Sequence, residues 1–249
     1  MEDKFSYYDK HYMRMGNQPP ELTNMQKYSE KFALSEKWLP DNLQSRILDI
    51  GCGWGNLLQN LNAMGFRNLY GVDINQRQCD IAQKSLPPDI NITCSDGVDF
   101  LQKHDDFFDL ITLFDVLEHM NVEKASLLLS ACLRSLYIGG SVVIRVPNMA
   151  NFLAACSRYI DITHVNGYTE WSLFQLLDMA GFEDHEVIKP LTFSREEWKK
   201  QRTVLAPWRG LGLREWLNEL IHRFFYACRG LRPRPSVFSA NITIQSFHR

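Results

Sequence analysis

The sequence of 249 residues has no Cys-x-x-Cys pair, and its formal net charge is only −2. The six cysteines are scattered, which argues against a zinc knuckle or a disulfide framework. The small charge argues against a nucleic-acid-binding polycation. An apolar run of ~20 residues, as a membrane span requires, is also missing, and so are the basic start and apolar stretch of a signal peptide. We therefore expect a soluble protein of the reducing cytoplasm.

From residue 41 onward, short apolar runs alternate with amphipathic stretches. The runs predict strands at 46–50, 68–72, 90–94, 108–113 and 140–146. The stretches between them predict helices near 56–64, 75–85, 97–103 and 123–136. Strands that alternate with helices favour a parallel sheet with right-handed crossovers, so we expect an open, doubly wound, Rossmann-like α/β fold.

The segments around this core are more varied. Residues 1–40 are rich in aromatic residues and predict an N-terminal helical lid. We expect a further helix at 169–180, ended by Gly181, and a sixth strand at 183–189. A seventh strand is expected at 236–247, and it would place Phe238, Ala240, Ile242 and Ile244 on one face. The segment between the last two strands is too long for a simple hairpin loop. The expected organisation is a lid at 1–40, a ligand-binding domain at 41–190, a helical insertion at 191–235 and a last strand within 236–249.

The most informative motif follows the first predicted strand and reads Asp49-Ile-Gly51-Cys52-Gly53-Trp-Gly55. Glycines at such a turn let the backbone approach a ligand where a side chain would collide. The amide groups at the start of the next helix are available to negative groups. A plain strand-to-helix turn would need one glycine rather than three at alternate positions, so the motif indicates a ligand-binding loop.

Acidic residues end the next two predicted strands. Asp73 follows the second strand, and Asp96-Gly97 follows the third. A carboxylate at the second strand tip can accept both hydroxyls of a ribose. One at the third tip can accept from an adenine amino group, and Gly97 leaves room for the base. Either aspartate could instead cap the helix that follows it.

Together these residues resemble the class I S-adenosylmethionine-dependent methyltransferases. The dinucleotide fingerprint of the competing nicotinamide-binding fold is Gly-x-Gly-x-x-Gly, which differs from the spacing here. The resemblance covers 45–190 and implies a seven-stranded, mostly parallel sheet with S-adenosylmethionine as cofactor. It implies that Asp49 lies near the methionine part, Asp73 binds the ribose and Asp96 meets the adenine. The expected cofactor-binding residues are Asp49, Gly51, Cys52, Gly53, Gly55, Asp73, Ile74, Asp96, Gly97 and Phe114.

The segment after the fourth strand, Phe114-Asp115-Val-Leu-Glu118-His119, looks like the Asp-x-x-Glu-His stretch of small-molecule and lipid O-methyltransferases. In those enzymes it flanks the transferable methyl group. Ubiquinone-pathway and small-RNA 2′-O-methyltransferases use a similar stretch to hold a divalent metal, so Asp115, Glu118 and His119, with His164, could bind Mg²⁺ or Mn²⁺. The stretch also occurs without metal. We expect no metal here, and a capping or hydrogen-bonding role for Glu118.

A second acceptor-side motif lies after the fifth strand and reads Tyr159-x-Asp161-x-Thr163-His164-x-x-x-Tyr168-Thr169. It resembles methyltransferases encoded among surface-polysaccharide biosynthesis enzymes, which carry a histidine in the substrate loop. Thr169 could equally be a helix cap, and His164 a structural loop residue. We take His164 as the first candidate for a general base and His119 as the second, because an unperturbed imidazole can be neutral at pH 7.

The insertion combines an apolar stripe with positive charge. Helical spacing relates Leu213, Trp216, Leu217, Leu220, Ile221, Phe224, Phe225 and Cys228. Residues 207–234 also hold six arginines against two glutamates. A basic amphipathic helix can lie on an anionic membrane or grip a phosphorylated lipid carrier. It can equally pack on its own domain or across a homodimer, so peripheral contact with the inner face of the membrane through 211–234 stays one of several alternatives.

The expected function is methyl transfer from S-adenosylmethionine to a hydroxyl. The expected acceptor is a sugar of a surface polysaccharide, or of its lipid-linked or nucleotide-linked precursor. A quinone, phenol, lipid or other small molecule is the alternative acceptor, since such enzymes would share every cofactor residue. The small net charge disfavours RNA. A binding module without catalysis would keep the same glycine loop.

Overall fold

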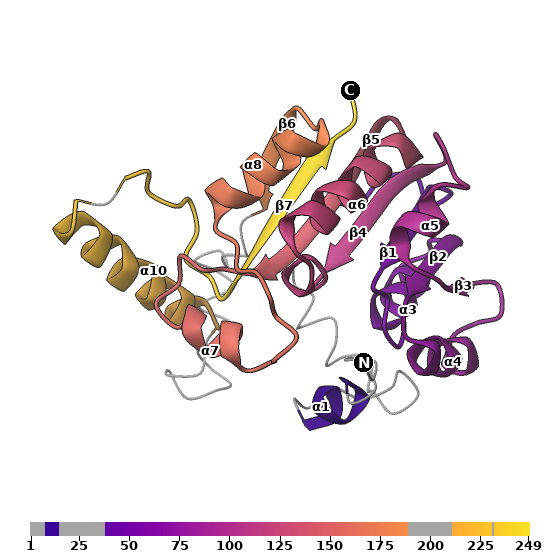
Figure 1. Cartoon of the computed structure of the whole chain (residues 1–249), viewed down its shortest axis with the longest axis horizontal. Coiled ribbons are helices and arrows are strands. Elements are labelled where there is room, and N and C mark those ends of the chain that lie inside the picture. The colour runs from indigo at the N-terminus through magenta and orange to yellow at the C-terminus, as the bar shows by residue number, and fades with distance from the viewer. Residues whose placement is uncertain (1–7, 15–37, 189–210, 231) are drawn as a thin grey trace.

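The computed structural model describes residues 8–14, 38–188, 211–230 and 232–249 (Figure 1). Within them lies one sheet of seven strands in the order β3-β2-β1-β4-β5-β7-β6. The strands are β1 Arg46–Ile50, β2 Asn68–Asp73, β3 Asn91–Cys94, β4 Phe108–Phe114, β5 Leu136–Pro147, β6 Asp184–Ile188 and β7 Asn241–Phe247. Strands β1 to β5 pair in parallel, and β7 runs antiparallel to β5 and β6. The predicted Rossmann-like, mostly parallel sheet is confirmed.

Helices cover both faces of the sheet (Figure 1). They are α3 Asn56–Ala63, α4 Gln76–Ser85, α5 Gly97–Leu101, α6 Val122–Ser135 and α8 Glu170–Ala180, with a short 3-10 helix η3 at Leu117–His119. Side chains of β1 alternate between two apolar cores. Leu48 and Ile50 face the core of α5, α6 and α8, and Ile47 faces that of α3 and α4. Because both faces of the strand are buried, apolar side chains are needed on both, which explains the nearly continuous apolar runs in the sequence.

The last strand is shorter than predicted, because the chain before it is held by side chains instead of a strand ladder. The amide of Asn148 donates to the carbonyls of Val237 and Ser239, and the amide of Asn151 donates to that of Phe238. The carbonyls of 237–239 are thereby satisfied without a neighbouring strand. The strand therefore begins at Asn241 and not at 236, and Ala240 is exposed, although we predicted it on the same face as the buried Ile242 and Ile244.

Between β5 and α8 the chain also forms a short helix that the sequence did not predict, α7 Ala154–Tyr159. Thr169 caps α8 in a capping box with Ser172, which confirms the alternative role considered for this threonine. Gly181 ends the same helix in the left-handed conformation, as predicted.

The outer segments are described in part. Of the predicted lid, α1 at Tyr8–Arg14 is a helix, and 1–7 and 15–37 lie outside the described residues. Of the predicted insertion, α10 at Leu211–Cys228 is a helix, and 191–210 lie outside them. In the part of the chain that the structure covers, every helix is too short or too polar to cross a bilayer.

Candidate active site

The glycine loop between β1 and α3 makes the tight turn that its sequence predicts. Gly51, Gly53 and Gly55 all have positive φ angles, of 73°, 55° and 81°. A Cβ added at Gly51 would lie 2.4 Å from Cγ2 of Val116. One at Gly55 would lie equally close to a methyl group of Leu86. The loop therefore depends on glycine both for its conformation and for its close approach to neighbouring groups.

Asp73 ties the tip of β2 to this loop. Its Oδ2 accepts the backbone N–H of Gly53 at 2.9 Å, and its Oδ1 accepts that of Asn75 at 2.8 Å. The cap of α4 is Asn75, whose side chain accepts from Arg77 and Gln78. The capping role considered for Asp73 is therefore wrong, and its carboxylate stands at the strand tip beside the glycine loop.

Asp96, in contrast, does cap a helix. Its Oδ1 accepts the N–H of Val98 at 2.9 Å, at the start of α5. Its Oδ2 accepts a hydrogen bond from Nζ of Lys124 at 2.8 Å. Burial alone would raise the pKa of Asp96, but these hydrogen bonds outweigh it and hold the pKa below its ordinary value. Capping and ligand binding are compatible, because Asp96 and Gly97 also border the cavity described next.

A cavity of about 400 Å³ opens at the carboxyl ends of β1, β2 and β4. It is lined by Ile50, Gly51, Val72, Asp73, Ile74, Asn75, Gln78, Asp96, Gly97, Asp115, Val116, His119, Met120, Asn121, Lys124 and Val165. The sheet order reverses here, between β1 and β4, and open α/β sheets bind ligands at such a point. Acidic side chains at two strand tips and an apolar wall suit a nucleoside.

Asp49 lies behind the glycine loop and does not border the cavity. Its side chain is buried, and its Oδ1 accepts a 2.7 Å hydrogen bond from the hydroxyl of Thr112. Burial raises the pKa of Asp49 to about 7, although the hydrogen bond and the positive charge of Arg145 oppose the change. Asp49 is thus a carboxyl that can change its charge near neutral pH.

At one end of the cavity, three side chains form a hydrogen-bonded chain. The hydroxyl of Thr163 lies 2.7 Å from Oδ1 of Asp161 and 2.8 Å from Nδ1 of His119. Burial would raise the pKa of Asp161, but hydrogen bonds from Thr163 and the nearby imidazoles of His119 and His164 hold it below its ordinary value. His11 of α1 also approaches Asp161, at 3.6 Å. Helix α1 of the predicted lid therefore contacts the loop that follows α7.

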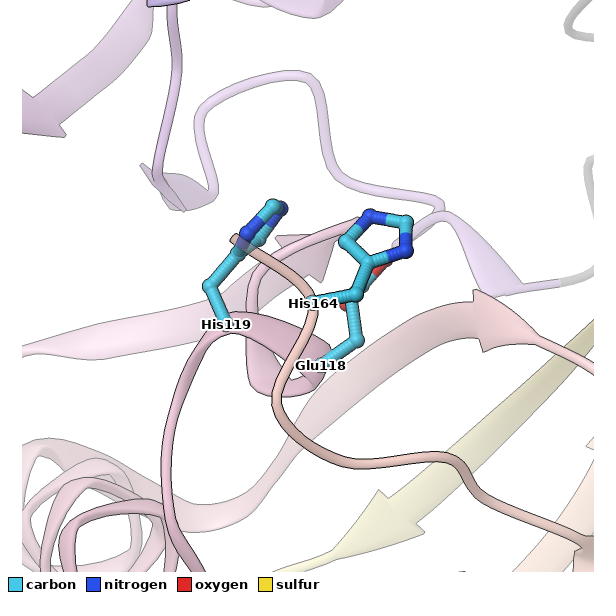
Figure 2. Close-up of side chains that lie close together, drawn as sticks. All are labelled: Glu118, His119 and His164. Atoms are coloured by element: carbon cyan, nitrogen blue, oxygen red, sulfur yellow. The ribbon is translucent and has the colours of Figure 1, made fainter. Parts of the chain in front are cut away.

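Figure 2 shows Glu118, His119 and His164 close together. Their ligand atoms all lie within 4.8 Å of one another, and the two imidazole rings meet edge-on with centroids 4.7 Å apart. Nδ1 of His164 donates to the carbonyl of Ser157 at 2.9 Å. One carboxylate and two imidazoles could hold a divalent cation or move a proton.

Glu118 is 1% exposed, and within the described residues neither carboxylate oxygen has a hydrogen-bond partner. The hydrogen-bonding role expected for its side chain is therefore wrong, and only its backbone carbonyl accepts, from Val165 and Asn166. Burial, with the negative charge of Asp115, raises the pKa of Glu118 well above its ordinary value. Asp115 forms an ion pair with Arg145. It is not one of the side chains whose ligand atoms cluster, which are Glu118, His119 and His164.

A family model for a methyltransferase domain matches residues 22–187, which is more than half of the chain. The chain belongs to the methyltransferase domain family. Its fold is that of the class I methyltransferases. A solved S-adenosylmethionine-dependent methyltransferase from Archaeoglobus fulgidus has a TM-score of 0.68 and 21% identity, and covers 97% of this chain and 100% of its own.

Two further relatives differ in their chemistry. Phosphoethanolamine N-methyltransferase 2 of Haemonchus contortus, solved with S-adenosylhomocysteine and phosphomonomethylethanolamine, matches with a TM-score of 0.62 and 17% identity, over 98% of this chain and 59% of its own. The ubiquinone biosynthesis O-methyltransferase of Aromatoleum aromaticum is 30% identical over 112 residues, which are 44% of this chain and 46% of that enzyme. The match thus spans less than half of this curated relative.

The predicted site residues fall into two groups in this methyltransferase. Those that line the cavity are Gly51, Asp73, Ile74, Asp96, Gly97 and His119. Those that lie beside or behind it are Asp49, Cys52, Gly53, Gly55, Phe114 and His164. Phe114 packs edge-on against Trp38 and lies under the guanidinium of Arg145. His119 therefore stands nearer to the cavity than His164, which reverses the order in which the motifs placed them.

The sequence did not predict four polar residues that line the cavity, namely Asn75, which caps α4, and Gln78, Asn121 and Lys124. Gln78 approaches the glycine loop from α4, since a Cβ at Gly53 would lie 2.9 Å from its Oε1. Asn121 caps α6 through the N–H of Lys124. Lys124 then reaches Asp96, 28 residues earlier in the chain. Asn121 as an N-cap residue and Glu123 in the first turn signal a helix start, but only the packing of α6 beside α5 brings Lys124 to the cavity.

Proposed function

We propose that the protein is an O-methyltransferase that moves a methyl group from S-adenosylmethionine to an acceptor hydroxyl. The proposal is supported above all by one observation, that His119 lines the same cavity as Asp73 and Asp96. A place for a nucleoside and a base for a hydroxyl thus border one cavity. When bound, S-adenosylmethionine supplies an electrophilic methyl group.

The chain's own residues fit this cofactor. Gly51 and Val116 both line the cavity, and they can pack this closely only because position 51 carries no Cβ, which would lie 2.4 Å from Cγ2 of Val116. Asp73 stands where a ribose would be held, and Asp96 with Gly97 where an adenine would be met. Asp49 supplies a buried carboxyl behind the loop, on the side where the family resemblance places the methionine part.

We propose His119 as the base that removes the proton of the acceptor. The carboxylate of Asp161 can only accept, so the single proton of the Thr163 hydroxyl is directed to it. Thr163 must then accept from Nδ1 of His119, which carries its proton there and its lone pair on Nε2. A neutral imidazole with this tautomer can take a proton from a hydroxyl.

His164 is set up in a similar way. Because Nδ1 donates to the carbonyl of Ser157, its lone pair is also on Nε2. Its ring lies beside that of His119 but outside the lining of the cavity. We therefore assign it to the orientation of the acceptor rather than to proton removal.

For the acceptor, we propose a sugar hydroxyl of a surface polysaccharide or of its lipid-linked or nucleotide-linked precursor. The support is the motif from Tyr159 to Thr169, in which Asp161, Thr163 and His164 meet His119 as an acceptor-facing loop would. A phenol of the quinone type is the second candidate, and the identity shared with a ubiquinone biosynthesis O-methyltransferase favours it.

The test is methyl transfer from cofactor labelled on its methyl group. Purified protein is incubated with separate pools of nucleotide sugars, lipid-linked glycans, quinols and RNA. We expect label in a hydroxyl of a glycan pool, stable to conditions that remove methyl esters, and none with the Asp73→Ala variant. Label in the quinol pool alone would favour the second candidate. Label in RNA, or in none of the pools, would contradict the proposal.

A further inference from the structure

The apolar stripe of α10 faces outward. Its described members Leu217, Leu220, Ile221, Phe224 and Phe225 are all exposed, and Phe224 is 62% exposed. The side that packs on the rest of the protein is polar and is centred on His222, which is 3% exposed. The helix is therefore amphipathic, as predicted, and in the described residues its apolar side is largely exposed, although Phe225 contacts Phe152 edge-on.

His222 explains how α10 is held in this orientation. Its Nδ1 donates to the carbonyl of Asn218, and its Nε2 accepts the backbone N–H of Phe152, each at 2.7 Å. The amide of Asn218 donates to the carbonyl of Phe238 at 2.7 Å. The imidazole also stacks on Phe152 and Phe238, with centroids 4.0 and 5.2 Å away. Every hydrogen-bonding position of the ring is used, so the packing side of α10 is well defined.

A second exposed apolar segment adjoins this stripe. It comprises Phe152, Leu153, Tyr159, Ile160 and Ile162, of which Tyr159 is 77% and Ile162 96% exposed. Phe152 meets Phe225 edge-on at 5.4 Å, which joins the two segments, and Figure 1 shows α7 beside α10. We call these ten residues the apolar face. Contiguous exposed apolar surface of this kind marks an interaction site.

Positive charge accompanies the apolar face. Arg229, Arg232 and Arg234 follow its last members, are exposed, and have no acidic partner in the described residues. Arg223 is the basic residue of α10 that forms an ion pair, with Glu219. Such a combination of exposed Leu, Ile and Phe with unpaired arginines is typical of helices that lie in a membrane interface.

We propose that the apolar face docks on an anionic lipid surface. The charge of Arg229, Arg232 and Arg234 complements an anionic surface, which is why we commit to a lipid surface as the occupant. The chain from Ile162 runs directly into Thr163 and His164, so docking would bring the acceptor end of the cavity close to the bilayer. From this position we infer that the acceptor is lipid-linked. This inference rests on the proposed function, whereas the docking itself does not.

The first test is flotation of the full chain with vesicles of phosphatidylcholine and phosphatidylglycerol. We expect binding at low salt, release at high salt and far less binding to phosphatidylcholine alone. Phe224→Ser should weaken binding about ten-fold. The matched control is Ile138→Ser, which alters an exposed apolar residue of β5 remote from this face and should bind normally. Failure of the wild type to bind, or normal binding by Phe224→Ser, would overturn the proposal.

Charge is tested separately. Replacing Arg232 and Arg234 together by Gln should lower binding roughly five-fold per arginine at low salt. Lys103→Gln, in the exposed turn after α5, should not. Sedimentation equilibrium tests for self-association, because a dimer that Phe224→Ser dissociates would assign the face to a second copy instead.

The docking and the proposed function can fail separately. Absence of vesicle binding with intact methyl transfer to a water-soluble acceptor would refute the docking alone. Vesicle binding without methyl transfer to any pool would refute the proposed function alone.

Discussion

Nδ1 of His119 lies 2.8 Å from the hydroxyl of Thr163, although the two residues are 44 positions apart in the chain. The contact joins η3, which follows β4, to the loop after α7, and so joins the two motifs that we propose to face the acceptor. Because Thr163 gives its proton to Asp161, it receives one from His119. The hydroxyl therefore selects the tautomer of the proposed base and also fixes its ring.

Thr163→Val should test this relationship, because valine keeps the shape of threonine but cannot accept from His119. We expect kcat to fall about 10- to 100-fold, with the affinity for cofactor unchanged by calorimetry. Thr163→Ser keeps the hydroxyl and should retain most of the activity. If both variants lose activity equally, the threonine acts through packing alone.

The two imidazoles should respond differently to substitution. His119→Gln should lower kcat ~100-fold or more, because a proposed general base is lost. His164→Gln should mainly raise KM for the acceptor, with kcat within about ten-fold of wild type. Steady-state kinetics with the acceptor varied separate the two effects. A larger loss of kcat in His164→Gln would return the role of base to the residue that the motifs placed first.

The sequence predicted the strand-tip residues that line the cavity better than it predicted the contacts of the loop after α7. Gly51, Asp73 and Asp96 lie at strand tips, and a strand tip is found from local apolar runs and the residues that follow them. The chain Asp161–Thr163–His119 depends on how a loop folds back across the sheet, which no local pattern reports. His222 shows a second limit. Amphipathic spacing marks two sides of α10, but a buried, fully hydrogen-bonded imidazole decides which side packs.

Asp73→Ala should abolish measurable cofactor binding. The carboxylate is the proposed ribose acceptor, and it also holds the N–H groups of Gly53 and Asn75. Losing charge-assisted hydrogen bonds of this kind should weaken binding at least ~100-fold by calorimetry. Asp80→Ala, on the exposed side of α4, is the matched control. A variant that stays folded and binds cofactor normally would remove Asp73 from the site.

Chelation addresses the cluster in Figure 2. Asp115 is engaged by Arg145, which leaves Glu118 as its single carboxylate. We expect initial rates in EDTA to stay within about two-fold of those in Mg²⁺, because a proton-transfer role for His119 needs no cation. A loss of rate that Mg²⁺ or Mn²⁺ restores would instead make Glu118, His119 and His164 the ligands of a divalent ion.

The buried carboxyl of Asp49 should make the stability of the cofactor-free protein depend on pH. Its pKa rises from 3.8 to about 7 on folding, so between these values the folded state keeps a proton that the unfolded state has lost. The contribution of Asp49 to the free energy of unfolding therefore falls as pH rises from about 4 to 7, by an amount of the order of 4 kcal/mol, and is constant above that range.

Asp49→Asn keeps an oxygen for the hydroxyl of Thr112 but carries no charge, so it should lack this decline. Urea unfolding at acidic and at alkaline pH should show the variant gaining stability over the wild type only at the alkaline end. Asp105→Asn, an exposed control on the surface, should leave the wild-type curve unchanged. The gain should come with weaker cofactor binding if Asp49 lies near the methionine part of the cofactor, as we propose. A variant that loses stability equally at both pH values would show that Asp49 stabilises the fold and is not a strained functional group.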